Sequence, residues 1–160
     1  MQNLLKPRMN HPACLVPGAL EALQNLGDTV EKSSLPRRIA GLVHLRASQM
    51  NGCSACVYGG ISMLKSSGES DERLAMVAVW RDAPFFDDTE RAALELCEVL
   101  TSLSPCSGHA VISDEIWERV AQHFDEPQLG ALLLSIANTN VWNRLNVATK
   151  QVAGAWKSQE

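Results

Sequence analysis

The sequence has no continuous apolar run of about 18 residues, the length that a membrane-spanning helix requires. Its N-terminal stretch, MQNLLKPRMNHPACLVPG, also lacks the continuous apolar core of a secretory signal peptide. Basic residues are not in excess, since 14 Lys and Arg stand against 18 Asp and Glu, for a formal net charge of −4. Nucleic-acid binding needs a concentrated basic face, which is missing. We therefore expect a cytoplasmic protein with no membrane or nucleic-acid partner.

The chain also lacks the patterns of a β-protein, a repeat protein and a disordered chain. Alternating apolar and polar residues between hairpin turns, which indicate β-strands, are absent, as are internal repeats and low-complexity tracts. The 160 residues are 46% hydrophobic and 20% charged, close to the average for globular proteins. This length and composition favour one folded domain with a sizeable core.

Helical periodicity and helix-end signals recur along the chain instead. Ser70 precedes two acidic residues and predicts a helix start, while Gly68 and Pro84 predict helix ends. The predicted helices start near Pro17, Ser33, Cys53, Ser70, Asp87, Ser113 and Pro127, and the last continues to about Thr149. We therefore predict an all-α fold of about six or seven helices, in a single domain that covers residues 1–160.

Two of the five cysteines form a close pair in the stretch SQMNGCSACVYGG at 48–60. Cys53 and Cys56 follow the Asn51-Gly52 break and stand at the start of a predicted helix, where unpaired N–H groups stabilise a thiolate. Such a pair can reduce a disulfide, attack a hydroperoxide and resolve the sulfenic acid, or hold half of a zinc site. In a reducing compartment these roles are favoured over a structural disulfide. The plainer alternative is two small core residues.

A zinc site would need a second pair of ligands. Cys106 and His109 have a suitable spacing, but they lie in a stretch with Ser, Pro and Gly that is typical of a loop. The sequence contains no second Cys-x-x-Cys and no histidine pair at zinc-finger spacing. We therefore expect neither a metal nor another cofactor.

Five segments, in this order and spacing, resemble the carboxymuconolactone decarboxylase superfamily, and specifically its alkylhydroperoxidase D-like (AhpD-like) branch. The first contains the cysteine pair and reads LVHLRASQMNGCSAC. The segments are residues 42–56, 68–74, 80–86, 90–94 and 142–147. The resemblance covers roughly residues 15–152, which would form the core of the domain. It implies an all-helical fold that assembles into homo-trimers or homo-hexamers.

The resemblance also implies a thiol-dependent peroxidase, an antioxidant oxidoreductase that reduces small organic hydroperoxides through a redox-active disulfide. In such members the second cysteine attacks the peroxide and the first resolves the product. This assigns the attacking role to Cys56 and the resolving role to Cys53, with a dithiol or a thioredoxin-like protein as reductant. The decarboxylase members lack the pair, so its presence counts against lactone decarboxylation.

The chain departs from the peroxidase pattern at two positions. The pattern has a histidine four residues after the second cysteine, where this chain has Gly60. It has a glutamate twelve residues before the first cysteine, where this chain has Gly41. Both members of the usual proton relay are therefore absent. The missing side chains leave the backbone at Gly59-Gly60 open to a substrate or to a closely packed helix, and we expect the latter.

His44 is the predicted replacement for the missing base. It lies one helical turn from Gly41, on the same face, and an imidazole titrates near neutral pH. An interface or surface position is the alternative. Tyr58 could reach the pair, but a phenol is a poor base near neutral pH. Arg46 could stabilise a thiolate, or it could pair with Glu95 or Glu98, and Glu98 could itself orient His44 or act as a base.

Two other classes of function stay open. The chain could be a non-enzymatic oligomer that uses Cys53 and Cys56 as a redox switch or for thiol exchange with a partner. It could also be a lactone-type decarboxylase or a hydrolase that works without thiols.

Overall fold

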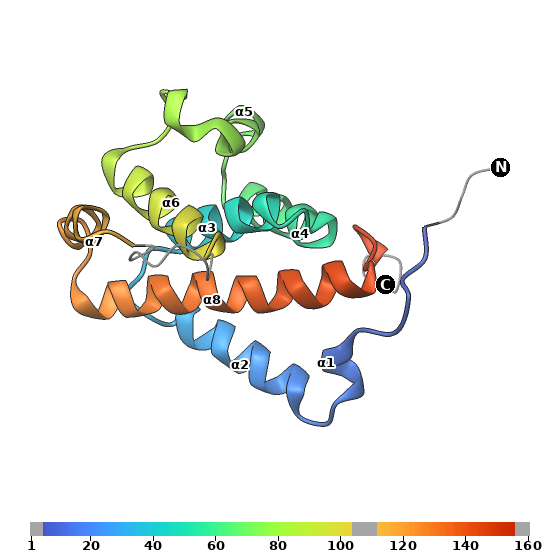
Figure 1. Ribbon diagram of the computed structural model, residues 1–160. Helices are drawn as coiled ribbons and strands as arrows, with labels where there is room; N and C mark the ends of the chain where they lie inside the picture. The colour runs from blue at the N-terminus through green and yellow to red at the C-terminus, as the bar shows by residue number, and fades with distance from the viewer. Residues whose placement is uncertain (1–4, 104–111, 156–160) are drawn as a thin grey trace.

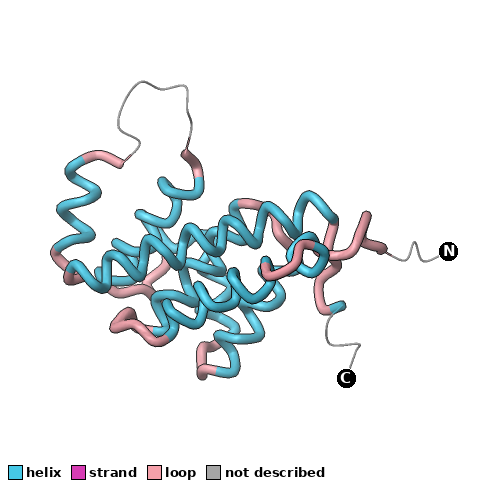
Figure 2. The backbone as a smooth tube through the Cα atoms, turned by 90° about the horizontal axis from the view of Figure 1, so that it is seen from below, coloured by secondary structure: helices cyan, strands magenta, loops and turns pink. Residues whose placement is uncertain are grey.

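The computed structural model describes residues 5–103 and 112–155, and in these ranges every regular element is a helix (Figure 1). The tube in Figure 2 likewise contains helices and loops without a strand. The predicted all-α class is therefore confirmed. The elements are α1 (Pro12–Leu15), α2 (Ala19–Glu31), α3 (Arg37–Met50), α4 (Ser54–Ser66), α5 (Asp71–Met76), the 3-10 helix η1 (Val77–Asp82), α6 (Asp88–Thr101), α7 (Asp114–Ala121) and α8 (Glu126–Thr149).

Local capping chemistry explains several helix starts. The Ser70 and Ser113 hydroxyls accept hydrogen bonds from backbone N–H groups in the first turns of α5 and α7. Asp87 and Glu90 form a capping box at α6, and Asp125 forms one with Gln128 at α8.

The fourth predicted helix differs from the prediction, because it divides into α5 and η1. The backbone leaves helical geometry at Val79, a β-branched residue of low helix propensity.

Helix α3 is the centre of the fold and packs against α4, α6 and α8. One of its faces contributes Val43 and Ala47 to a core shared with α6, α7 and α8. Another contributes Leu42 and Leu45 to a core shared with α4, α5 and η1. Figure 1 shows the long α8 crossing below α3 and α4, so residues late in the chain reach the beginning of α4.

The two ends of the described chain meet beside the C-terminal end of α8. The backbone N–H of Arg8 donates to the Thr149 carbonyl (2.8 Å), and the Arg8 guanidinium donates to the Ala148 carbonyl (3.0 Å). Gln151 returns a hydrogen bond to the Met9 carbonyl (3.2 Å). Figure 1 shows both termini on the same side of the molecule. This arrangement places Leu5 and Lys6 near the start of α4.

Helix α8 keeps several large apolar side chains on the surface. Leu134, Val141 and Val147 are 44%, 40% and 45% exposed.

A bilayer-spanning helix needs both length and sustained apolar character, and no helix within residues 5–103 and 112–155 combines the two.

Candidate functional site

The cysteine pair stands at the turn that connects α3 to α4. Gly52 adopts a left-handed conformation (φ +66°), which a residue with a side chain would adopt only with strain. Cys53 is the N-cap of α4, and its Sγ accepts a hydrogen bond from the Cys56 backbone N–H (3.3 Å). The Cα atoms of Cys53 and Cys56 are 5.3 Å apart, and the two residues form a disulfide. The predicted site residues Cys53 and Cys56 are thus joined covalently at the start of a helix.

Asparagine side chains fix this turn against α8. Asn51 donates to Oδ1 of Asn140 (3.0 Å) and to Oδ1 of Asn143 (2.9 Å). Asn143 is fully buried and donates to the Ser48 hydroxyl on α3 (3.0 Å). Buried amides that are bonded in this way have few alternative positions. The N-terminus of α4 is therefore held in a defined place relative to α8.

Asn146, one turn nearer the C-terminus, contacts the pair directly. Its Nδ2 donates to Sγ of Cys56 (3.3 Å), across 90 positions of sequence. Reasoning from the sequence did not single out Asn146 as a site residue. The available signal was its place in the segment 142–147, one of the five that carry the family resemblance. An amide N–H aimed at a sulfur stabilises that sulfur as a thiolate.

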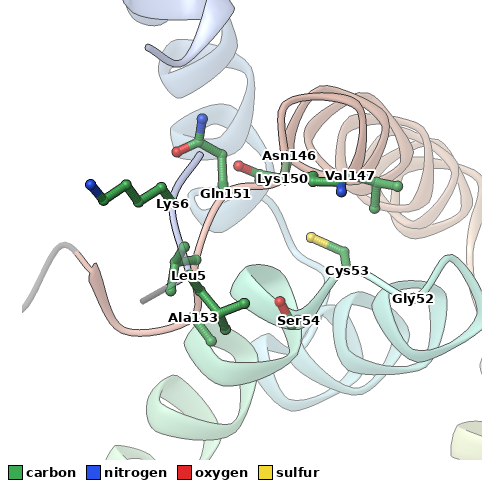
Figure 3. Close-up of a pocket in the computed structure, with 11 residues that line it drawn as sticks. Leu5, Lys6, Gly52, Cys53, Ser54, Asn146, Val147, Lys150, Gln151 and Ala153 are labelled. Atoms are coloured by element: carbon green, nitrogen blue, oxygen red, sulfur yellow. The ribbon is translucent and has the colours of Figure 1, made fainter. Parts of the chain in front are cut away.

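A pocket of about 410 Å³ lies between the start of α4 and the end of α8. Cys53 forms part of its wall and Cys56 does not, and Figure 3 shows the Cys53 side chain below Asn146 and Val147. Among the described residues that line this pocket, two are lysines, Lys6 and Lys150, and none is acidic. The Lys6 side chain points away from Cys53 (Figure 3). The pocket wall therefore contains two lysines and one cysteine of the disulfide.

Lys150 has an unusual backbone for a lysine. It is the C-cap of α8 in a left-handed conformation (φ 54°, ψ 46°), a position that glycine fills most easily. Within the described ranges it is the one non-glycine residue with a positive φ.

His44 lies beside Cys56 but contacts its backbone rather than its sulfur. The His44 Nε2 is 3.3 Å from the Cys56 carbonyl oxygen, and Nδ1 is 3.2 Å from the Thr139 hydroxyl. A carbonyl oxygen can only accept, so Nε2 carries the proton and the neutral Nδ1 accepts from Thr139. Burial lowers the pKa of His44 below its ordinary 6.5, although the bond to Cys56 acts in the opposite direction. His44 is therefore a neutral imidazole at physiological pH.

The two glycines at the relay positions are closely packed rather than open. A Cβ at Gly60 would lie 2.8 Å from Cδ2 of His44, and a Cβ at Gly41 would lie 2.5 Å from Cδ2 of Leu64. The His44 ring thus occupies the space beside position 60, and the Leu64 side chain occupies the space beside position 41. At Gly60, the expectation of a closely packed helix agrees with the structure, because the neighbouring His44 belongs to α3.

The other candidates near the pair form their own networks. Glu98 accepts hydrogen bonds from Arg46 (2.7 Å), from the Trp80 indole (2.9 Å) and from Arg81. Burial acts to raise the pKa of Glu98, but these donors prevail and hold it below the usual range. Arg46 therefore pairs with Glu98, while Glu95 pairs with Arg119 (2.9 Å).

Two further predictions concern Tyr58 and zinc. The Tyr58 ring lies against Gly154, since a Cβ built there would be 3.5 Å from Cε1 of the ring. Cys106 and His109, the second half of the zinc alternative, lie outside the described residues. Within those residues no group of three or more His, Cys, Asp and Glu side chains is placed to hold a metal ion.

Comparisons of the sequence and of the structure with known proteins point to one family and to one shared helical fold. The model of the carboxymuconolactone decarboxylase family matches residues 17–98. The uncharacterized protein YdfG of Bacillus subtilis is 34% identical over 84% of this chain and 88% of its own length. The uncharacterized protein YnjA of Escherichia coli is 35% identical over 74% of this chain and 62% of its own.

Solved structures have the same helical arrangement. Atu0492 of Agrobacterium tumefaciens, a protein of unknown function named as a candidate antioxidant defence protein AhpD, superposes with a TM-score of 0.84 at 29% identity. The match covers 94% of this chain and 99% of that one. The debrominase Bmp8 gives a TM-score of 0.74 over 87% of this chain and 73% of its own, at 18% identity, which establishes similarity of fold alone.

Proposed function

Because the chain belongs to the carboxymuconolactone decarboxylase family, we propose that it is a thiol-dependent redox protein of the AhpD-like branch that reduces organic hydroperoxides through Cys53 and Cys56. The observation that carries the proposal is the disulfide of this pair at the N-terminus of α4, where Cys53 is the N-cap. A pair that closes a disulfide at a helix N-terminus, where thiolates are stabilised, can cycle between dithiol and disulfide.

The cycle follows the roles that the resemblance implies. The Cys56 thiolate attacks the outer oxygen of the hydroperoxide, the O–O bond breaks, and the alkoxide takes up a proton and leaves as an alcohol. Cys56 is then a sulfenic acid. The Cys53 thiolate attacks its sulfur and hydroxide leaves as water after protonation, which closes the disulfide. A dithiol or thioredoxin-like reductant reopens it, so one hydroperoxide consumes one dithiol.

Two groups near Cys56 support its attacking role. The N–H of Asn146 would stabilise the Cys56 thiolate, because a charge-assisted hydrogen bond favours the ionised form. His44 stays the predicted base. With its nitrogens bonded to the Cys56 carbonyl and to Thr139, accepting the thiol proton requires the ring to release Thr139 from Nδ1.

Thiol–disulfide exchange with a protein partner is the second candidate. It is favoured by the packing at the relay positions, since Gly41 and Gly60 supply no base and neighbouring side chains fill the space. Exchange between thiols needs no proton relay of the peroxidase kind, only a reactive thiolate and access to it. A redox switch would use the same chemistry without turnover.

The proposal includes assembly with copies of the same chain in the cytoplasm. The apolar side chains exposed along α8 would be covered in a homo-trimer or a homo-hexamer. A reducing cytoplasm would supply the dithiol that the cycle consumes. Size-exclusion chromatography with light scattering measures the assembly, and a monomer at micromolar concentration would contradict it.

The deciding experiment measures consumption of cumene hydroperoxide by the reduced protein with excess dithiothreitol. We expect turnover that Cys56→Ser abolishes and that Cys53→Ser lowers strongly. The matched control is Cys14→Ser, which removes an exposed cysteine outside the pair and should leave turnover unchanged. If no variant differs from the uncatalysed rate but the disulfide still forms reversibly, the exchange candidate replaces the peroxidase. A pair that cannot be oxidised and reduced would contradict both.

A further inference from the structure

Five exposed residues of α8 form one narrow stripe. They are Leu134, Ala137, Val141, Arg144 and Ala148, and the two largest apolar ones, Leu134 and Val141, are 44% and 40% exposed. Successive members are three or four residues apart and the pattern repeats every seven, which is the spacing of a helix that pairs with another helix. We propose that this α8 stripe pairs with the same stripe of a second copy of the chain, with the two helices antiparallel about a two-fold axis.

The inference rests on the assembly that the proposed function includes, and not on the redox chemistry. That assembly is a homo-trimer or a homo-hexamer. A cyclic homo-trimer contains no two-fold axis, whereas a homo-hexamer made of two facing trimers contains such axes. A two-fold contact at the α8 stripe therefore selects the homo-hexamer.

The composition of α8 suits contact with another helix. Between Pro127 and Thr149 the sequence contains no Asp or Glu and one basic residue, Arg144. The Arg144 guanidinium donates to the backbone carbonyl and to Oδ1 of Asn140, one turn earlier (3.0 and 2.8 Å). The charge therefore lies back along α8, and the aliphatic part of the side chain is available for packing against a partner.

Grooves on both sides of the stripe leave room for side chains of the partner. On the side of α6, a cavity of about 440 Å³ is lined by Leu100 and Val141, among others. On the side of α2, a cavity of about 260 Å³ is lined by Val30 and Leu134, among others. Helix α8 runs along most of the length of the molecule (Figure 1). Ridges of a second helix can therefore pack into these grooves along a long contact.

The single arginine of the stripe disfavours a parallel pair. In a parallel pair each residue stands beside its own copy, so two Arg144 side chains would meet at one level. In the antiparallel pair, Ala137 stands opposite the partner's Val141, and Arg144 stands opposite the partner's Leu134. The two arginines are then about 15 Å apart along the axis. The helix dipoles also point in opposite directions, which is the favourable arrangement.

The same register brings opposite charges together at each end of the pair. The partner's Glu126 falls at the level of Val152, two residues or about 3 Å along the axis beyond Lys150. Glu126 and Lys150 are both exposed, and neither forms an ion pair with another residue in the described part of the chain. This charge complementarity supports a second copy of the chain as the occupant of the stripe.

The pairing also reaches the redox site. Lys150 lines the pocket that contains Cys53, and no acidic residue is among the described residues of its wall. The partner's Glu126 would stand beside Lys150 and add a carboxylate to the rim of that pocket. The assembled protein thus has a charge at the Cys53 pocket that a single chain lacks.

Disulfide cross-linking tests the register, in the full-length protein with Cys14→Ser and Cys106→Ser as background. Ala137→Cys and Val141→Cys chains with different tags are expressed separately and together, and the purified assemblies are oxidised with copper phenanthroline. We expect a covalent dimer of one chain of each kind, in at least tenfold excess over the self-linked dimers. Linkage of each variant to itself, or no linkage at all, would overturn the inference. The control is Trp117→Cys on α7, because Trp117 is also 40% exposed, and it should form no dimer.

The mass of the assembly is measured by size-exclusion chromatography with light scattering. We expect a homo-hexamer for the unmodified protein and half that mass for Val141→Glu, which places a carboxylate in the paired stripe. Trp117→Glu should leave the mass unchanged. Glu126→Lys and Lys150→Glu should each raise the dissociation constant of the pair several-fold at low salt, and the two together should restore it. A trimer of the unmodified protein, or an unchanged mass for Val141→Glu, would overturn the inference.

The outcomes separate the inference from the proposed function. A monomeric unmodified protein would contradict both the assembly and the two-fold contact. An assembly without the cross-link between positions 137 and 141 would leave the proposed function intact and overturn the α8 pairing alone. The cross-link in a protein without peroxide turnover would support the pairing and contradict the peroxidase. Val141 and Ala137 are exposed, so their substitutions do not disturb the core of the fold.

Discussion

Gly60→Ala, which adds one methyl group, should destabilise the protein when His44 is present and stabilise it in the His44→Ala background. Gly60 lies inside α4, where replacing glycine with alanine stabilises a helix by about 0.8–1 kcal/mol. The new Cβ would, however, stand 2.8 Å from Cδ2 and 3.4 Å from Nε2 of the His44 ring. That ring is bonded at both nitrogens, so it can move only by giving up a hydrogen bond.

Overpacking of this kind typically costs about 1–3 kcal/mol, which exceeds the helix gain. We therefore expect Gly60→Ala to lower the free energy of unfolding by about 1 kcal/mol, a fall of about 2–4 °C in melting temperature for a domain of this size. In the His44→Ala background the collision disappears and the helix gain remains. The same substitution should then stabilise the protein by about 0.8–1 kcal/mol.

The assay is a double-mutant cycle from urea unfolding followed by circular dichroism, with the disulfide intact. Gly130→Ala is the matched control, because Gly130 lies inside α8 and a Cβ there meets nothing within 4 Å. It should stabilise both backgrounds by the same amount. If Gly60→Ala also stabilises both backgrounds equally, the close contact between position 60 and the His44 ring is refuted.

The remaining predictions concern charge, strain and reactivity. Because burial lowers the pKa of His44, the unfolded chain binds a proton first as the pH falls below 6.5, so stability should decline in that range. His44→Gln should flatten this part of a plot of unfolding free energy against pH, and an unchanged slope would contradict the assignment. Lys150→Gly should relieve a left-handed backbone and raise the free energy of unfolding by about 1 kcal/mol. An unchanged free energy of unfolding in urea denaturation would contradict this strain. Burial raises the pKa of Cys97 to about 12, so iodoacetamide at pH 8 should label Cys14 and leave Cys97 unlabelled in the folded protein. Labelling of Cys97 before unfolding would show that the core opens there.

Structural features that depend on residues close together in the chain, such as helix starts, could be predicted from the sequence. The helix starts at Ser70, Asp87 and Ser113 agree with the structure because each cap acts on the first turn of its own helix. The division of the fourth predicted helix has a local signal in the β-branched Val79, but the path of the chain after η1 depends on contacts with another helix. Arg91 of α6 donates to the carbonyls of Arg81, Ala83 and Phe86, and these contacts hold the turn after η1.

In the candidate site, too, some features follow from the local sequence and others depend on tertiary packing. Spacing alone indicated that Cys53 and Cys56 can form a disulfide at a helix start, and the structure contains that bond. The contact of Asn146 with Cys56 could not be predicted from the sequence, because it exists only after α8 has packed against α4. The position of His44 near the pair followed from helical register. Its bonds to the Cys56 carbonyl and to Thr139 depend on the tertiary packing.

The meeting of the two ends of the described chain beside the pocket has a practical consequence for protein engineering. Leu5 and Ala153 both line the pocket that contains Cys53, and hydrogen bonds join the segments that carry them to the end of α8. A thiol-bearing module fused to either end through a short flexible linker would therefore meet Cys53 at a millimolar effective concentration. Electron delivery would then no longer depend on the concentration of a separate reductant. Under the proposed function, a single-chain fusion of this kind would carry its own reductant, with a linker length that can be tuned to the span between module and pocket.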